Sequence, residues 1–438
     1  MRNKIRRYLL VLCLIMCLTS LYILTSVTGK YRIKEDIGKR TECINDRDDG
    51  RQYKYDANVK KNLSFVTSDM EAMYQERRNR MLKACVGREA EMKGKKTAKY
   101  VKNNIIIDQV LGIAYCPVEK IASTFWKRVL RLVVGEAHAK SPFDSTVIAL
   151  ANFNNLTSIP EGMVDRFMKE SLTFMFVREP YGRLLSAYVD KLFSPNLLFW
   201  KIYGGFGVHV TRNESTECGH NLTFKEFVKT VLYADEVNQK RNGHFTPSYE
   251  HCDPCRYKWQ VIGTLDSLSQ DIFYILDRIG RTDLMRSLNK DFREQYLNDT
   301  IVDQFNWLFY FRDSYANDCK VTFYEAQKRL WKQFQIRGVL TKESEFPLTT
   351  EESEGLTKTK LMSIVYNAMG NAEKRSKARK NKAEAFKEAY STLDREDLDK
   401  LSKMFQPDCD LYGYDCQPEQ LFNTERTVIE PWFFKYDT

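Results

Sequence analysis

The stretch LTFMFVREPYGRLLSAYVDKLF, from Leu172 to Phe193, decides the fold. Its first six residues form a short apolar run, which predicts a buried strand. Pro180 suits the first turn of a helix, and the apolar residues after it repeat at helical spacing. The stretch therefore predicts a strand that ends before Arg178 and continues directly into a helix.

A second segment of the same design precedes it. The sequence LGIAYCPVEKIASTFWKRVLRLVV, from Leu111 to Val134, predicts a buried strand, a loop after Cys116 and a helix that Gly135 ends. Another apolar run covers residues 105–107. We expect strands and helices to alternate in this way to about Tyr414, which is the pattern of a layered α/β domain.

Both strand-to-helix turns carry groups that bind anions. Lys120, Ser123 and Thr124 lie at the start of the first helix, where free backbone N–H groups and the helix dipole favour phosphate or sulfate. Arg178 can reach two oxygens of one phosphate, and Ser186 lies two turns into the second helix. Two anion sites at the carboxyl ends of neighbouring strands suit a nucleotide with phosphates at both ends. A GxxxxGK[ST] loop is absent, which argues against a nucleoside triphosphatase.

The N-terminal region predicts a membrane anchor. Tyr8 to Val27 contains no charged residue over about one bilayer of helix, and basic residues precede it. This favours an uncleaved signal anchor with a cytoplasmic N-terminus; a cleaved signal peptide is the alternative. Nine cysteines beyond the anchor fit an oxidising compartment and leave at least one without an internal partner. Five glycosylation sequons agree with this and begin at Asn62, Asn155, Asn213, Asn221 and Asn298.

We predict five parts: a cytoplasmic tail (1–7), a transmembrane signal anchor (8–27), a luminal stem (28–102), a catalytic domain (103–420) and a C-terminal tail (421–438). Late in the domain, the basic run from Glu373 to Lys382 is predicted to be helical. A solvated face is the favoured interpretation of this run, and contact with a polyanion is the alternative. Ser391 and Asp394 are expected to cap the short helix that follows.

These segments resemble the Golgi carbohydrate sulfotransferases of the chondroitin/dermatan 4-O and glucuronyl 3-O type. The 5′-phosphosulfate motif of that family, YCxxPKxxCTNWKRV, is similar to residues 115–129, and its 3′-phosphate motif is similar to residues 174–193. Two further blocks, residues 244–263 and 405–414, also fit the family. The resemblance implies a single P-loop-kinase-like sulfotransferase domain with a central parallel sheet flanked by helices, which binds 3′-phosphoadenosine 5′-phosphosulfate (PAPS) and needs no metal.

The resemblance also implies roles for individual residues. Lys120 would stabilise the bridging oxygen of PAPS, Ser123 and Thr124 would bind its 5′-phosphate, and Arg178 and Ser186 its 3′-phosphate. The full expected donor set is Lys120, Ile121, Ala122, Ser123, Thr124, Phe125, Trp126, Arg178 and Ser186, with Lys127, Arg128 and Arg183 as further candidates. An acceptor hydroxyl must lose a proton, and His244 is the expected base because it falls in a matching block.

Three departures from the family pattern lie in the first motif: Glu119 replaces a proline, Ser123 a cysteine or glycine, and Phe125 an asparagine. Glu119 places a carboxylate beside the expected sulfate site and would weaken donor binding if it points inward. A catalytically weak, glycan-binding member of the family is therefore an alternative. Cys252 and Cys255 are expected in structural disulfides rather than in a zinc site, because no second pair of ligands has matching spacing.

The net charge of +10 favours an anionic partner without choosing among them. The resemblance implies an acceptor that is a chondroitin/dermatan-type glycosaminoglycan or a related acidic glycan. It also implies a single-pass type II protein of the Golgi membrane with a luminal catalytic domain; a homodimer is compatible with this, and nucleic acid is not expected. The rival enzyme class is a type II glycosyltransferase, which would need a D-x-D motif for Mn²⁺.

Overall fold

The computed structural model describes residues 57–90, 92, 94–137, 139–144, 146–149, 152–289, 292–423 and 429–435. The elements considered below belong to the compact unit Asn62–Thr438, apart from residues 57–61 at the start of the first described helix. The expected anchor, Cys43 and His138 lie outside the described residues. Within the described ranges, no helix is both long enough and apolar enough to cross a membrane.

The sheet has four strands in the order β1-β2-β3-β4. Strands β2 (Ile113–Cys116), β3 (Leu172–Val177) and β4 (Val261–Thr264) are parallel, and β1 (Ile106–Asp108) is antiparallel to β2. The expected central parallel sheet is thus present in β2, β3 and β4, and an antiparallel strand lies at its edge. Only four residues join β1 to β2, which is long enough for a hairpin but too short for the crossover that parallel strands need.

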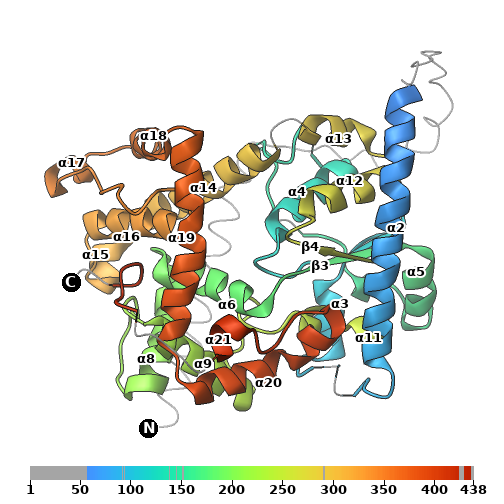
Figure 1. Ribbon diagram of the computed structural model, residues 1–438, viewed down its shortest axis with the longest axis horizontal. Helices are drawn as coiled ribbons and strands as arrows, with labels where there is room; N and C mark the ends of the chain where they lie inside the picture. The colour runs from blue at the N-terminus through green and yellow to red at the C-terminus, as the bar shows by residue number, and fades with distance from the viewer. Residues whose placement is uncertain are drawn as a thin grey trace, which may run out of the picture. The chain divides into compact units, whose positions relative to one another are not determined.

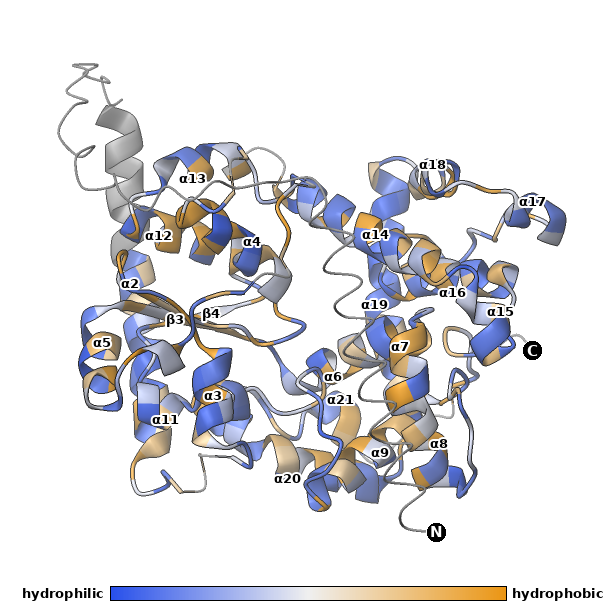
Figure 2. Cartoon of the chain, turned by 180° about the vertical axis from the view of Figure 1, so that it is seen from behind, coloured by the Kyte–Doolittle hydropathy of each residue, from blue (hydrophilic) through white to orange (hydrophobic). Residues whose placement is uncertain are grey.

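Helices cover both faces of this sheet. Figures 1 and 2 show α4 (Ser123–Val133), α12 (Leu268–Arg278) and α13 (Thr282–Asn289) on one face. The opposite face carries α3 (Ala98–Asn104), α5 (Val164–Glu170) and α11 (Pro254–Tyr257). The predicted α/β layering with helices on both sides is confirmed for this part of the chain.

Aromatic packing fixes α4 against the sheet. Trp126 is fully buried, with its ring centroid 4.9 Å from that of Phe174 and 5.2 Å from that of Phe176. Tyr115 stacks on Phe174 at 4.9 Å. Because these rings lie on β2, β3 and α4, their packing holds the first turn of α4 at the carboxyl ends of β2 and β3.

The first described helix is integrated into the same core. Helix α2 (Ala57–Cys85) buries Met70, Tyr74 and Met81 in the hydrophobic cluster that contains the sheet. The Tyr74 hydroxyl donates a hydrogen bond of 2.6 Å to Asp271 on α12. From Met70 onward, the segment expected to be a stem is therefore packed against the sheet.

After β4, every described element is helical, so the expected alternation of strands and helices up to Tyr414 is wrong. Apolar residues of this region and of the helices between β3 and β4 repeat at helical spacing and are buried in two further clusters away from the sheet. Besides α4, the helices that contribute most to the cavity described below are α6 (Pro180–Tyr188), α14 (Phe292–Tyr310), α16 (Phe323–Ile336) and α19 (Ala372–Ser391). The others are α7 (Leu197–Phe199), α8 (Gly205–Arg212), α9 (Phe224–Glu236), α10 (Tyr249–Cys252), α15 (Ser314–Cys319), α17 (Thr350–Glu354), α18 (Lys358–Met369), α20 (Arg395–Tyr412) and α21 (Glu419–Phe422).

The start of α20 differs from the expected capping arrangement. Asp394 alone caps this helix, and its side chain accepts the backbone N–H of Asp397. Ser391 is instead the last residue of α19. The helix itself is longer than predicted, with 18 residues, because its apolar stripe continues beyond Phe405 into the disulfide-bonded Cys409.

Four disulfides join the described cysteines. They are Cys85–Cys255, Cys116–Cys252, Cys218–Cys319 and Cys409–Cys416. The prediction that Cys252 and Cys255 form structural disulfides is confirmed. These two bonds tie β2 and the end of α2 to the short helices α10 and α11, on the side of the sheet next to the predicted nucleotide loop.

Replacing both Cys116 and Cys252 with serine should lower the free energy of unfolding by roughly 4 kcal/mol, because with Cys85–Cys255 still in place this bond closes a loop of about 34 residues. The matched control replaces Cys409 and Cys416, which are only 7 residues apart, and should cost roughly 2.5 kcal/mol by the same loop-entropy relation. Urea unfolding without reductant measures both. Equal losses in the two variants would contradict the loop-entropy explanation.

Candidate functional site

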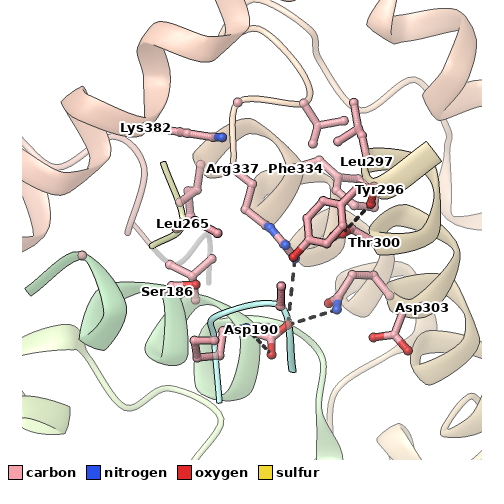
Figure 3. A pocket seen from close by; sticks show the side chains of 18 of the residues that line it. Ser186, Asp190, Leu265, Tyr296, Leu297, Thr300, Asp303, Phe334, Arg337 and Lys382 are labelled. Atoms are coloured by element: carbon pink, nitrogen blue, oxygen red, sulfur yellow. Dashed lines mark hydrogen bonds and ion pairs between the residues drawn. The ribbon is translucent and has the colours of Figure 1, made fainter. Parts of the chain in front are cut away.

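A cavity of roughly 830 Å³ opens where β2 and β3 end. Its walls come from the loop after β2, from α6 and from α14, together with residues 334–339 and α19. Figure 3 shows part of this lining, with Ser186 and Asp190 on one side and Tyr296 and Phe334 on another. The volume lies within the range of small-molecule sites.

The structure brings most of the predicted site residues to this one cavity. The lining residues among them are Lys120, Ala122, Ser123, Thr124, Phe125, Arg178, Ser186 and His244. Ile121 and Trp126 do not line it; both are fully buried in the core. The Trp126 ring packs against Phe174 and Phe176, so Trp126 positions α4 and does not contact a ligand.

The loop before α4 has an unusual backbone. Lys120 and Ala122 have φ values of 70° and 58°, in the left-handed region that residues other than glycine rarely adopt. Helix α4 begins after Ala122 without a side-chain cap. The first N–H groups of α4 therefore have no partner within the helix, and they lie beside the cavity. Strained backbone of this kind often marks a binding site, and free N–H groups suit an anion.

Lys120 is held by an aspartate that the sequence analysis did not identify. The Lys120 Nζ atom lies 2.8 Å from Asp190 Oδ2, and Lys191 Nζ lies 3.1 Å from the same oxygen. Gln304 on α14 donates to Asp190 Oδ1 at 3.0 Å. Burial lowers the pKa of Lys120 to about 8, against the opposing effect of Asp190. Burial alone would raise the pKa of Asp190, but Lys120 and Lys191 hold it well below its usual value.

Arginines in and near α6 have different tasks. Arg178 lines the cavity, and its Nη1 lies 3.4 Å from the Lys120 carbonyl oxygen, which joins the two predicted turns. Arg183 is buried and does not line the cavity. It donates to the carbonyl oxygens of Glu119, Gly243 and Thr246 at 3.1, 3.0 and 2.7 Å. Arg183 thus clamps two loops together and does not contact a ligand.

Two other candidates from the first motif also lie off the cavity. Arg128 forms an ion pair with Asp299 on α14, and neither Arg128 nor Lys127 is among the lining residues. Both side chains lie on α4 beyond its first turn. Arg128 thus joins α4 to α14, and the cavity takes its charge from other residues.

Glu119 points inward. Its carboxylate lines the cavity, with Oε2 at 3.6 Å from Nδ1 of the buried His251. Burial would raise the pKa of Glu119, but His251 and His244 bring it below its usual value. A Cβ atom at Gly243 would approach Glu119 Oε1 to 2.7 Å, so the carboxylate occupies space that glycine leaves free.

His244 is the only histidine among the described lining residues. Its Nδ1 atom lies 2.7 Å from Asn242 Oδ1. Burial, followed by the positive charge of Lys191, lowers the pKa of His244 to about 3. The ring is therefore neutral near pH 7, which is the state that a proton acceptor needs.

Five further cations reach the cavity from the C-terminal half: Arg293, Arg337, Arg375, Arg379 and Lys382. Arg337 points toward Asp190, and Lys382 extends into the cavity from another wall (Figure 3). The Arg337 Nη1 atom is buried without a hydrogen-bond partner among the described residues, and lies 3.9 Å from Asp190 Oδ1. Burial and the nearby Arg337 and Arg178 lower the pKa of Lys382.

Helix α19 therefore presents part of its basic run to the cavity. Arg375, Arg379 and Lys382 are spaced at i, i+4 and i+7, which places them on one side of the helix, and all three line the cavity. Arg375 also pairs with Glu294 of α14 at 3.1 Å. Arg379 and Lys382 are exposed, as the favoured expectation of a solvated face requires, but all three side chains also line the cavity, and their spacing was the signal that could have found them.

A sequence model of the sulfotransferase family matches residues 103–305, which include both strand-to-helix turns. Carbohydrate sulfotransferase 14 of Danio rerio is 29% identical over 53% of this chain and 65% of its own length. Carbohydrate sulfotransferase 11 of Mus musculus is 28% identical over 50% of this chain and 65% of its own. Carbohydrate sulfotransferase 12 of Xenopus laevis is 27% identical over 65% and 72%. No solved structure matches significantly.

The alignments thus span just under two thirds of the first two relatives. They support the resemblance found in the two motifs, and the matched segment supplies Lys120, Arg178, Ser186 and His244 to the cavity. Arg337 and the basic side of α19 come from beyond that segment. The family match covers just under half of the chain and agrees with the two motifs, and the relatives that this chain resembles are carbohydrate sulfotransferases.

Proposed function

We propose that this protein is a PAPS-dependent carbohydrate O-sulfotransferase whose acceptor is a hydroxyl group of an acidic glycan of the chondroitin or dermatan type. One observation carries the proposal: the two anion-binding turns, around Lys120 and around Arg178, open into a single cavity together with His244. The printed names of the relatives support carbohydrate sulfotransfer as the reaction.

The residues of the cavity fit such a donor. The positive charges of Arg337 and Arg178 lower the pKa of Lys382, so the three side chains lie near one another. Arg337 Nη1 has no hydrogen-bond partner among the described residues. Clustered cations repel one another until an anion lies between them. A phosphate near Ser186 would relieve this repulsion, and a second one could bind at the start of α4. Two separate phosphate positions are what PAPS needs.

When bound, PAPS supplies the sulfuryl group and the bond that breaks in the reaction. Lys120 would balance negative charge on the oxygen that leaves, at the strained loop before α4. His244 would take the proton of the acceptor hydroxyl, because its ring is neutral and faces the cavity. Glu119 adds negative charge on the same side, which disfavours a second carboxylate there and favours a neutral sugar hydroxyl.

The finer fold and cellular assignments belong to the same proposal. Parallel strands followed by helices, with an anion cradle at the start of α4, support a P-loop-kinase-like domain. The apolar segment at residues 8–27 supports a single-pass type II protein of the Golgi membrane. The sequon asparagines Asn213, Asn221 and Asn298 are exposed and so accessible to glycosylation. A homodimer stays a prediction.

The D-x-D motif that a glycosyltransferase would need is not available at Asp408-Cys409-Asp410. The buried Asp408 carboxylate accepts the backbone N–H groups of Ser248 and Tyr249, both at 2.7 Å. Cys409 is in a disulfide, and Asp410 pairs with Arg88 at 2.9 Å. Both carboxylates are thus used within the protein. The other such motif, at residues 46–48, lies outside the described residues.

The test is incubation of the full chain in detergent with sulfur-labelled PAPS and a panel of defined glycans. We expect the sulfur label to be transferred to a chondroitin or dermatan glycan even when EDTA is present. Disaccharide analysis of the labelled glycan then locates the sulfate. Binding of the product 3′-phosphoadenosine 5′-phosphate (PAP) without transfer to any glycan would favour the catalytically weak alternative. Transfer of sugar from a nucleotide donor, lost in EDTA, would favour a glycosyltransferase.

A further inference from the structure

The side chain of Asn242 contacts His244 at two points. Asn242 Oδ1 accepts the backbone N–H of His244 at 2.9 Å and lies 2.7 Å from His244 Nδ1. On the other side, Asn242 Nδ2 donates to the hydroxyl of Tyr203 at 2.8 Å. Asn242 itself does not line the cavity, whereas His244 does. Asn242 thus lies behind the histidine, away from any ligand in the cavity.

These contacts decide which ring nitrogen carries the hydrogen. The backbone N–H of His244 can only donate, so the atom that faces it must be the amide oxygen of Asn242 and not the amide nitrogen. Because an amide oxygen only accepts, the neighbouring Nδ1 must be the protonated nitrogen of the neutral ring. The other nitrogen, Nε2, then has a free lone pair. None of the described residues forms a hydrogen bond to it.

The surroundings of the ring keep this arrangement in place. His244 packs edge-on against Phe199, with ring centroids 5.4 Å apart. The charged groups that act on it are Lys191, Glu119, Lys120 and Asp190. Without a fixed partner, a neutral imidazole would divide between two tautomers, and only one of them has a free Nε2.

We propose that Asn242 is a positioning residue that holds His244 in the Nδ1–H tautomer, so that Nε2 can accept the proton of the acceptor hydroxyl. This rests on the proposed function, since it assigns His244 as the base. As the acceptor oxygen bonds to sulfur, its proton moves to Nε2, and the bond from sulfur to the donor phosphate oxygen breaks with its electron pair on that oxygen. The Nδ1–H of the resulting imidazolium stays on Asn242.

Kinetics of Asn242→Ala test the catalytic part. We expect kcat to fall about 10²-fold, in line with the loss of an oriented general base, while KM and PAP affinity change less than about threefold. Asn242→Asp should restore kcat to within about tenfold, because a carboxylate also accepts from Nδ1. It should also move the acid limb of the pH–rate profile to higher pH, because its charge stabilises the imidazolium. Asn306→Ala, an exposed asparagine on α14, is the matched control and should leave kcat unchanged.

Nitrogen NMR of histidine-labelled protein tests the tautomer without any turnover. The chain has five histidines, and loss of signals in His244→Gln identifies those of His244. We expect a protonated Nδ1 and an unprotonated Nε2 in the unchanged chain and in Asn242→Asp, and a mixture in Asn242→Ala. The same tautomer in Asn242→Ala, or an unchanged kcat, would overturn the proposal. If the unchanged chain binds no PAP, the proposed function fails, yet the NMR comparison still decides the role of Asn242.

Discussion

Lys120→Met is expected to transfer sulfate about 10²- to 10³-fold more slowly than the unchanged chain while it still binds PAP, since removal of one charge-stabilising group from an active site has effects of this size. Methionine keeps the length of the side chain and removes its charge. Asp190 would keep a cationic partner in Lys191, with Nζ at 3.1 Å, and a hydrogen bond from the Gln304 amide at 3.0 Å. Transfer of label from PAPS and calorimetry with PAP measure the two parts separately.

The pH dependence gives this result an internal control. The Lys120 ammonium is charged below its pKa of about 8 and neutral above it, so the transfer rate should fall as the pH rises through that value. Lys120→Arg should lose this fall, whatever its absolute rate, because a guanidinium stays protonated. Arg166→Ala, which removes an exposed charge on α5, should behave like the unchanged chain. An unchanged rate in Lys120→Met would remove Lys120 from the reaction.

Arg178→Ala is expected to weaken PAP binding by about ten- to a hundredfold, the usual cost of losing hydrogen bonds to a charged group. Binding of adenosine 5′-phosphate, which lacks the 3′-phosphate, should hardly change. Arg178→Lys should recover only part of the loss, because an ammonium cannot offer the two parallel donors of a guanidinium. Calorimetric titration of each variant with both nucleotides measures the difference.

The comparison of the two nucleotides separates recognition of the 3′-phosphate from general attraction. Lys382→Ala removes another positive charge from the same cluster, and we expect it to weaken PAP binding too, less than Arg178→Ala does, because Lys382 is reached by solvent. If Arg178→Ala lost equal affinity for PAP and for adenosine 5′-phosphate, Arg178 would not recognise the 3′-phosphate.

The part of the site around β2 and β3 could be predicted because its signals are local. A continuous apolar run predicted β3 at Leu172–Val177, and Pro180 predicted the start of α6. The carboxyl ends of neighbouring parallel strands lie together, so Lys120 and Arg178 were expected in one place, and they line one cavity. Here sequence spacing and spatial proximity follow from the same geometry.

The remainder of the site depends on packing that no local pattern encodes. Arg337 and Lys382 reach the cavity only because α16 and α19 pack together beyond the sheet, and a basic run alone does not show which side of its helix faces inward. The partnership of Asp190 with Lys120 depends on two segments 70 residues apart. The helical C-terminal half was missed for a related reason, since short apolar runs are compatible with strands as well as helices.

The order of synthesis adds a constraint that follows from the disulfides. Cys85 and Cys116 leave the ribosome well before their partners, which follow 170 and 136 residues later. Until Cys252 and Cys255 emerge, each of the two early thiols has the other as a nearby partner for an incorrect bond. An isomerase that keeps Cys85 and Cys116 apart, or that exchanges the bond between them, should therefore raise the yield of correctly folded protein during translation.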